Sequence, residues 1–324
     1  MRRSAVRDLL IGAVVLAALV LLPVLWPSKA LIDFVIRGAA LALFATSLNL
    51  LVGYGGLVSF GHGMFFGVGA YSFGLLMQRT GMPIPVAFVV TIVVTAAVAL
   101  LVGAICVRLK EIYFAFLTLA FQMFLHSLII LWVPLTGGDQ GLLGGIPRPP
   151  FFGIDLGDQR QLYIAACVLL VAGLLLMRHI VESPFGFTLR MIRDNAARTG
   201  FLGVEIFRIK LVAFVLAGVF AGIGGVIMSL FVSGAYPEFA YWTMSGEGIF
   251  MIMLGGITTF LGPTIGTVIL LLLNDFVTRF TEHHGLMLGA IILLFALGLR
   301  RGISDFLVDH WRRTRTPAAT RRGH

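Results

Sequence analysis

The polar side chains that could do chemistry in this chain lie within strongly apolar stretches. Hydroxyl, amide and imidazole groups can bind a polar solute or hydrogen-bond neighbouring helices, since lipid offers them no partner. Two interpretations stay open: interhelical hydrogen bonds, or the lining of a path for a solute. The residues are Asn49, Ser59 and His62, around a glycine-rich stretch, and Thr118, Gln122 and His126, which recur four residues apart on one helical face.

Sequence motifs for enzymatic chemistry are missing. None of the lysines follows a glycine, so the chain has no P-loop to bind ATP. It has no Cys-x-x-Cys or His-Glu-x-x-His, and the stretch 70–74 lacks the first glycine of a nucleophile elbow. His283 and His284 could bind a metal, but two neighbouring loop histidines are more often solvated. We therefore predict no catalytic residue, no metal and no cofactor in this chain.

The composition is that of an integral membrane protein. Of the 324 residues 59% are hydrophobic and only 12% charged, whereas soluble proteins have about 25% charged residues. The net charge of +9 comes largely from loops and termini. A nucleic-acid-binding protein needs a folded basic face, so this excess is better explained by the enrichment of Lys and Arg in cytoplasmic loops.

Apolar periodicity predicts an all-α membrane protein, a polytopic helical bundle of about ten transmembrane spans. Two spans are weak, because 57–77 is dense in glycine and 246–260 is short, so either could be a broken or re-entrant helix. Lys and Arg place both termini on the cytoplasmic side. The predicted spans are 9–26, 31–52, 57–77, 84–107, 112–134, 161–179, 210–232, 246–260, 262–280 and 285–300.

Three regions organise the chain: an N-terminal anchor helix (1–30), a transmembrane domain (31–313) and a disordered basic tail (314–324). The tripeptide 28–30 could be a signal-peptidase site. The apolar run before it is long for a signal peptide, so we expect an uncleaved anchor.

The longest polar interval between two apolar segments is 182–210, with five Lys or Arg residues that bar it from the bilayer. Ser183 suits an N-cap and Pro184 the first helical position, which predicts a short amphipathic helix. Phe185, Leu189 and Ile192 fall on its apolar face. Such a helix is either a solvated connector or a surface that docks on another protein.

Four motifs give a family resemblance over residues 30–300. The stretches 183–186 (SPFG) and 189–195 (LRMIRDN) resemble the cytoplasmic signature of permease subunits of branched-chain amino acid ABC importers, the LivM type. The stretches 59–71, 136–142 and 254–263 resemble three further segments of that family. Departures occur at Phe187, Ala196 and Thr258, where the family often has Arg, Glu and Gly.

The resemblance implies a permease that receives amino acids from a periplasmic binding protein in a bacterial inner membrane. It implies two ATPase subunits, which bind the ATP, and a second homologous permease or a second copy of this chain. We expect Phe185, Leu189 and Ile192 to fill a groove on the ATPase. The residues it assigns to ATPase coupling are Ser183, Pro184, Phe185, Gly186, Leu189, Arg190, Ile192, Arg193, Asp194 and Asn195.

Two alternatives remain for the function. The same importer class also carries urea, amides or aromatic acids. An ion-coupled secondary transporter would need membrane-embedded carboxylates, and only Asp33, Glu247 and Asp275 come near. For the importer, we expect His62, Gln122 and His126 to face one polar cavity.

Overall fold

The computed structural model describes residues 2–142, 144–150, 155–280, 285–287, 289–291, 293 and 302. Contacts divide the chain into two compact units, Met1–Gly248 and Ile249–His324. The described residues form helices and connecting segments, with no strand among them. This confirms an all-α protein.

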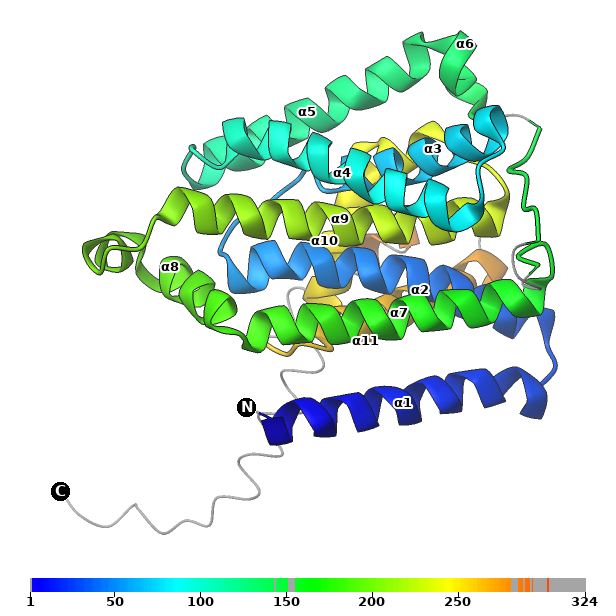
Figure 1. Ribbon diagram of the computed structural model, residues 1–324, viewed down its shortest axis with the longest axis horizontal. Helices are drawn as coiled ribbons and strands as arrows, with labels where there is room; N and C mark the ends of the chain where they lie inside the picture. Colours follow the sequence, from blue (N-terminus) through cyan, green and yellow to red (C-terminus); the bar gives the residue numbers. More distant parts are fainter. Residues whose placement is uncertain are drawn as a thin grey trace. The chain divides into compact units, whose positions relative to one another are not determined.

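The first unit contains most of the helices, and α10 begins in it (Figure 1). A π-helical turn, Leu50–Tyr54, continues α2, and short 3₁₀ turns occur at Gly138–Gln140 and Pro237–Ala240. The helices are α1 (Arg2–Leu25), α2 (Lys29–Asn49), α3 (Gly63–Thr80), α4 (Ile84–Cys106), α5 (Glu111–Leu131), α6 (Val133–Thr136), α7 (Gln159–Glu182), α8 (Pro184–Phe201), α9 (Ile206–Val232) and α10 (Trp242–Gly255).

The second unit contains the end of α10 and helix α11 (Gly262–Phe280). Glycines bring these two helices into backbone contact: a Cβ on Gly266 would overlap the carbonyl oxygen of Met251.

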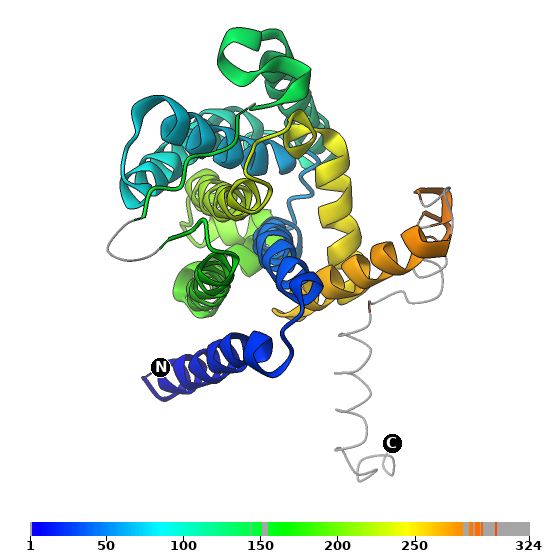
Figure 2. The same cartoon turned by 90° about the vertical axis from the view of Figure 1, so that its right-hand side faces the viewer.

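Helix α9 is the centre of the first unit, where it packs against α2, α3 and α4. Figure 2, which looks along these helices, shows α9 (yellow-green) beside α2 (blue) and α7 (green). Glycines allow the closest approach, because a Cβ on Gly225 would overlap the carbonyl oxygen of Phe66, and a Cβ on Gly69 would overlap that of Gly222. Small residues that let backbones touch are the usual means of packing helices in membranes.

Among the described residues, six helices are long and apolar enough to span a membrane, which does not support the predicted count of ten. They match the predicted spans at the N-terminus and near 31–52, 84–107, 112–134, 161–179 and 210–232. The two weak spans explain part of the difference. Helix α3 starts only at Gly63, after a non-helical segment, and α10 is 14 residues long and ends at Gly255. The six spans are Arg7–Leu25, Lys29–Tyr54, Ile84–Cys106, Ile112–Leu131, Gln159–Glu182 and Ile206–Val232.

The predicted anchor helix packs on the rest of the first unit through α7. The Tyr163 hydroxyl donates to the carbonyl of Leu19 over 2.6 Å, and Arg178 pairs with Asp8 over 3.0 Å. Both contacts join α1 to α7 along most of its length. Other predictions lie largely or wholly outside the described residues: the span 285–300, the histidines at 283–284 and the tail 314–324.

A non-helical connecting segment, residues 55–62, separates α2 from α3. The carbonyl of Leu51 accepts from the backbone N–H groups of Gly55 and Leu57, which closes the π-helical turn after α2. The chain then runs without regular secondary structure to His62, and the exposure of its residues alternates: Leu57, Ser59 and Gly61 are buried, while Val58 and Phe60 are exposed. This is the pattern of an extended strand, whose successive side chains point to opposite sides.

Candidate functional site

The buried side of the connecting segment is held by polar side chains from two other helices. The Ser245 hydroxyl in α10 accepts a hydrogen bond from the backbone N–H of Gly63 (2.8 Å) and donates to the amide oxygen of Gln122 in α5 (2.7 Å). The amide nitrogen of Gln122 donates in turn to the carbonyl of Tyr241 (2.6 Å). Because Gln122 and Ser245 are both fully buried, these bonds tie the start of α3 to α5 and α10. We call this group, Gly63, Gln122, Tyr241 and Ser245, the polar latch.

His62, the last residue of the connecting segment, is attached to α2. Its Nε2 lies 2.9 Å from the Ser47 hydroxyl, which also donates to the carbonyl of Phe44 (2.7 Å). The imidazole is fully buried and its ring centre lies 5.3 Å from that of Phe44 and 5.8 Å from that of Phe65. His62 therefore joins the segment to α2, whereas the polar latch involves α5 and α10.

The remaining predicted polar residues lie around the same segment. Thr118 is buried, and its carbonyl oxygen would overlap a Cβ on Gly61, so only glycine allows this contact. His126 is half-buried, with its ring centre 4.7 Å from that of Tyr241. The Ser59 hydroxyl accepts from the N–H of Gly61 over 3.3 Å, and Asn49 is buried at the end of α2.

The arrangement of Gln122 and His62 favours the first of the two interpretations, interhelical hydrogen bonding. A cavity on the exposed side of the connecting segment is lined by apolar residues. Among the described residues, no three His, Cys, Asp or Glu side chains gather as metal ligands.

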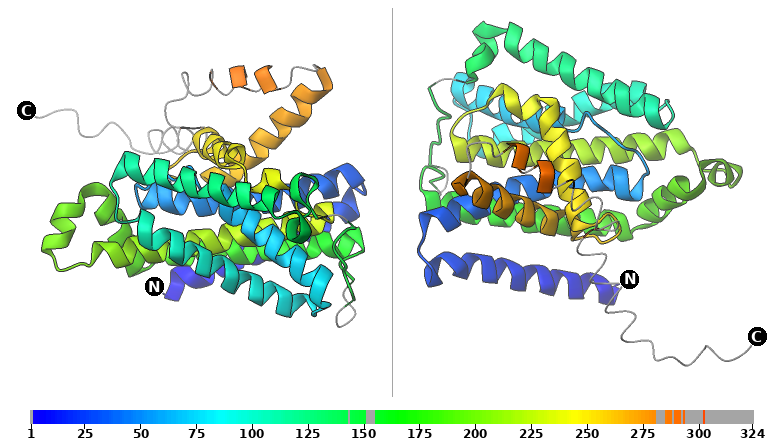
Figure 3. Two further views of the ribbon diagram at one scale, coloured as in Figure 1. Left: turned by 90° about the horizontal axis from the view of Figure 1, so that it is seen from above. Right: turned by 180° about the vertical axis from the view of Figure 1, so that it is seen from behind.

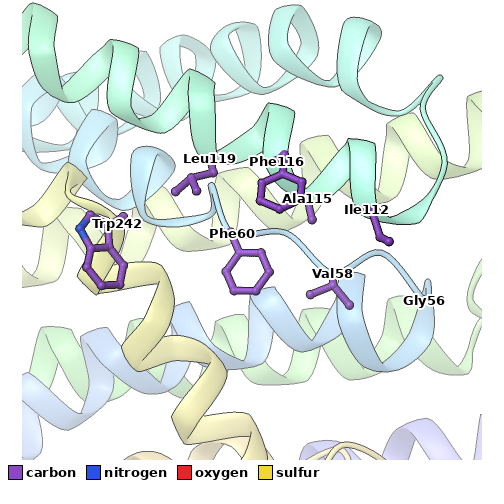
Figure 4. A pocket seen from close by; sticks show the side chains of 8 residues that line it. All are labelled: Gly56, Val58, Phe60, Ile112, Ala115, Phe116, Leu119 and Trp242. Carbon is purple, nitrogen blue, oxygen red and sulfur yellow. The ribbon is translucent and has the colours of Figure 1, made fainter.

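This cavity, which we call the apolar groove, has a volume of about 780 Å³ (Figure 4). The connecting segment forms one wall, the first half of α5 forms the other, and an indole closes one end. The lining residues are Gly56, Val58 and Phe60 from the segment, Ile112, Ala115, Phe116 and Leu119 from α5, and Trp242 from α10.

Helix α8 occupies the predicted amphipathic segment, and the turn into α9 projects beyond the other helices of this unit (Figures 1 and 3). Ser183 takes the N-cap position as predicted, although its hydroxyl donates backwards to the carbonyl of Ile180 (2.6 Å). Asn195 interrupts the helix with φ −160° and ψ 97°. Its side chain accepts from the N–H of Arg198 (2.9 Å), so it caps the second half of α8.

Two arginines of α8 join it to the end of α2. The Arg193 guanidinium donates to the carbonyl of Gly53. The aliphatic part of the Arg193 side chain lies against Gly56, because a Cβ added to Gly56 would come within 2.8 Å of the Arg193 Cγ. Arg190 donates to the carbonyl of Val181 (3.0 Å) and lies 5.7 Å from the centre of the Tyr54 ring. Gly56 lines the apolar groove, so α8 contacts one end of it.

The predicted apolar anchors of α8 are not open to a partner. Leu189 is completely buried and Ile192 is 3% exposed, because this face packs on the chain itself, with Leu189 against Gly55. Phe185 is half-buried. The expectation that these three side chains fill a groove on another protein is therefore wrong for Leu189 and Ile192. The exposed apolar residues of α8 and its turn are Phe187 (59%), Met191 (43%), Phe201 (91%) and Leu202 (70%).

Ser47 and Ser245 belong to the site but are not among the residues predicted from the sequence. Ser47 lies two residues before Asn49, and Ser245 precedes the short apolar stretch 246–260. Both are polar residues inside apolar surroundings, which is the signal that selected the other candidates. Their roles depend on partners 15 and 123 residues away.

The chain matches the family described as "Branched-chain amino acid transport system / permease component" over residues 30–296. Its relatives include the high-affinity branched-chain amino acid transport system permease protein LivM of Salmonella typhimurium, 26% identical over 314 residues, covering 89% of this chain and 74% of LivM. LivH of Escherichia coli K12 is 23% identical over 290 residues, covering 82% of this chain and 91% of LivH.

A further relative is the autoinducer 2 import system permease protein LsrC of Klebsiella pneumoniae, 27% identical over 201 residues, covering 58% of this chain and 55% of LsrC. No solved structure matches the chain. The family match covers most of the chain, including the connecting segment, the polar latch and α8. This multi-pass, all-α membrane protein therefore belongs to the permease family of branched-chain amino acid transport systems.

Proposed function

We propose that this chain is the non-enzymatic permease subunit of an ATP-driven importer that carries amino acids, above all branched-chain ones, into the cytoplasm. The observation that carries the proposal is the family match over residues 30–296, joined by the LivM relatives. Because the sequence has no P-loop, the energy must come from separate ATPase subunits. The complete importer has two such subunits, a second homologous permease or second copy of this chain, and a periplasmic binding protein.

Helix α8 is the part of the chain that we assign to ATPase coupling. Free energy released on a partner reaches the membrane helices only through an element with two discrete positions that contacts both. Arg193 fastens α8 to Gly53 and Gly56 at the start of the connecting segment. A displacement of α8 would thus move one wall of the apolar groove.

The ATPase contact is best supplied by the exposed apolar residues at the projecting end. Phe201 and Leu202 are among the most exposed large apolar side chains of the first unit. Buried aromatic anchors contribute most of the affinity at protein interfaces. Leu189 and Ile192 instead fix α8 to its own chain.

Single substitutions separate these two roles. Phe201→Ala should weaken association with the ATPase subunits but leave the thermal stability of the isolated permease unchanged, since this side chain is almost fully exposed. Leu189→Ala should lower the stability of the permease itself by about 2–5 kcal/mol. Co-purification and thermal melts measure the two effects. If the Phe201→Ala variant assembles and takes up solute normally, the turn between α8 and α9 is not part of the surface that contacts the ATPase.

For the topology, we propose ten passages with both termini cytoplasmic in a bacterial inner membrane, with α3 and α10 as interrupted passages. The distribution of Lys and Arg supports this. A cysteine at position 155 should then react with an impermeant thiol reagent from the periplasmic side. Reaction from the cytoplasmic side alone contradicts the proposal.

Uptake by the reconstituted importer is the test of the function. Vesicles containing the permease, its ATPases and the periplasmic binding protein of the same importer should accumulate leucine, isoleucine and valine when ATP is supplied inside. Urea, an aliphatic amide and an aromatic acid serve as competing solutes. ATP-dependent uptake of one of these solutes, with no uptake of branched-chain amino acids, would show that the protein is an importer subunit for a different solute.

A further inference from the structure

One wall of the apolar groove is non-helical backbone that lies beside a candidate membrane span. Val58 is 43% exposed and Phe60 is 42% exposed, and within the described residues their backbone N–H groups have no hydrogen-bond acceptor. The segment runs along α5, whose candidate span begins at Ile112, and Gly61 touches the carbonyl of Thr118 inside that span. Non-helical backbone at membrane depth must be covered by protein or must line a water-filled cavity. The open side of the groove therefore does not face lipid.

The walls of the groove are shaped for an apolar group. Val58 and Phe60 line the groove, whereas Ser59 between them is buried and does not line it. On the opposite wall, Ala115 and Leu119 face the groove, while Gln122, one turn further along α5, belongs to the polar latch. The volume of about 780 Å³ lies within the range of pockets for small ligands, about 300–1,000 Å³.

We infer that the apolar groove is the surface of the translocation path against which the aliphatic side chain of the solute lies, with free backbone N–H groups beside it to solvate the polar end. This inference rests on the proposed function and assigns the path to residues other than the buried polar ones. Gly56, at the end of the groove that α8 contacts through Arg193, connects the solute surface to the coupling helix.

Water access to the groove is tested first, with a matched pair of cysteine variants. Cys106 and Cys167, both buried and free, are replaced by alanine in the full chain, and Val58→Cys is compared with Val93→Cys. Val93 is 62% exposed on α4, within the span Ile84–Cys106, and lines no part of the groove. The reaction is measured in permeabilised native-membrane vesicles, so that a charged methanethiosulfonate reagent reaches both sides of the membrane. The reagent should modify Val58→Cys many times faster than Val93→Cys. Added leucine should slow the reaction at position 58. Equal rates, or no effect of leucine at position 58, would overturn the inference.

The size of the groove is tested with two alanines of α5. Ala115 lines the groove, whereas Ala120 is exposed outside it. Ala115→Leu should reduce leucine uptake several-fold, whereas Ala120→Leu should transport leucine like the wild type. Comparable uptake by both variants, at equal protein levels and basal ATP hydrolysis, would overturn the inference. If the wild-type importer transports no amino acid, the proposed function fails, and the cysteine rates still decide whether the groove holds water.

Discussion

Helix α3 meets its neighbours in two different ways. Along its length it packs on α9 through glycines, with the backbones of Phe66 and Gly225 in contact. At its N-terminal end it is held by the polar latch, through Ser245 and Gln122. A backbone contact depends on shape and allows one arrangement. The hydrogen bonds that Ser245 makes with the Gly63 N–H and with Gln122 can be exchanged, so we expect the N-terminal end of α3 to change position more readily than the part packed on α9. The contact of Gly61 with the Thr118 carbonyl limits this movement.

The difference has a consequence for transport. The path that we propose adjoins the latched end of α3, whereas the glycine contacts join α3 to α9. A permease needs a rigid scaffold on one side of its path and a movable element on the other. Substitutions in the two regions should therefore differ in kind as well as in size.

Among substitutions that compare these two ends of α3, the largest effect is expected from Gly225→Ala. The added Cβ would overlap the carbonyl oxygen of Phe66, and backbone cannot avoid it by changing rotamer. Overpacking of this kind costs about 1–3 kcal/mol and occasionally more, so thermal melts of the purified permease should show a large loss of stability.

Gly246→Ala is the matched control, because nothing lies within 4 Å of a Cβ at that position of α10. It should be neutral or slightly stabilising, since alanine favours a helix by about 1 kcal/mol over glycine. Equal stability of the two variants would show that the α3–α9 contact is not fixed by backbone shape.

A smaller effect is expected from Ser245→Ala. It leaves the N–H of Gly63 and the amide oxygen of Gln122 without their partner, at a cost of about 1 kcal/mol. Uptake should fall more than this loss of stability implies, because the end of α3 is no longer held in place. Ser229→Ala is the control, since that buried hydroxyl bonds only the carbonyl of Val226 in its own helix. Equal losses of uptake in both variants would show that the polar latch has no role in transport beyond helix packing.

The smallest effect is the coupling energy between Ser245 and Gln122. A double-mutant cycle of Ser245→Ala and Gln122→Leu, measured by thermal unfolding, should give about 0.6 kcal/mol, the average for such bonds in membranes. The pair Ser229→Ala and Gln122→Leu should be additive, because the two residues share no partner. Additivity in both cycles would mean that the bond between Ser245 and Gln122 contributes no stability.

The sequence by itself determined the membrane class, six of the spans and the helix outside the bilayer. The cost of placing Arg190 or Arg193 in lipid, and the gain from an apolar run such as 84–106, are properties of single segments. Ser183 and Pro184 likewise placed the start of α8 from local geometry alone. Four local motifs also sufficed to indicate the family.

Only the tertiary structure decided where helices stop inside the membrane and which faces are covered. Helix α3 begins at Gly63 and not at residue 57, because Gly61 must touch Thr118 and the N–H of Gly63 finds Ser245. Leu189 is buried because Gly55 lies beneath it, which amphipathic spacing could not reveal. In each case the partner is far away in the sequence, so the contact becomes visible only when the chain has folded.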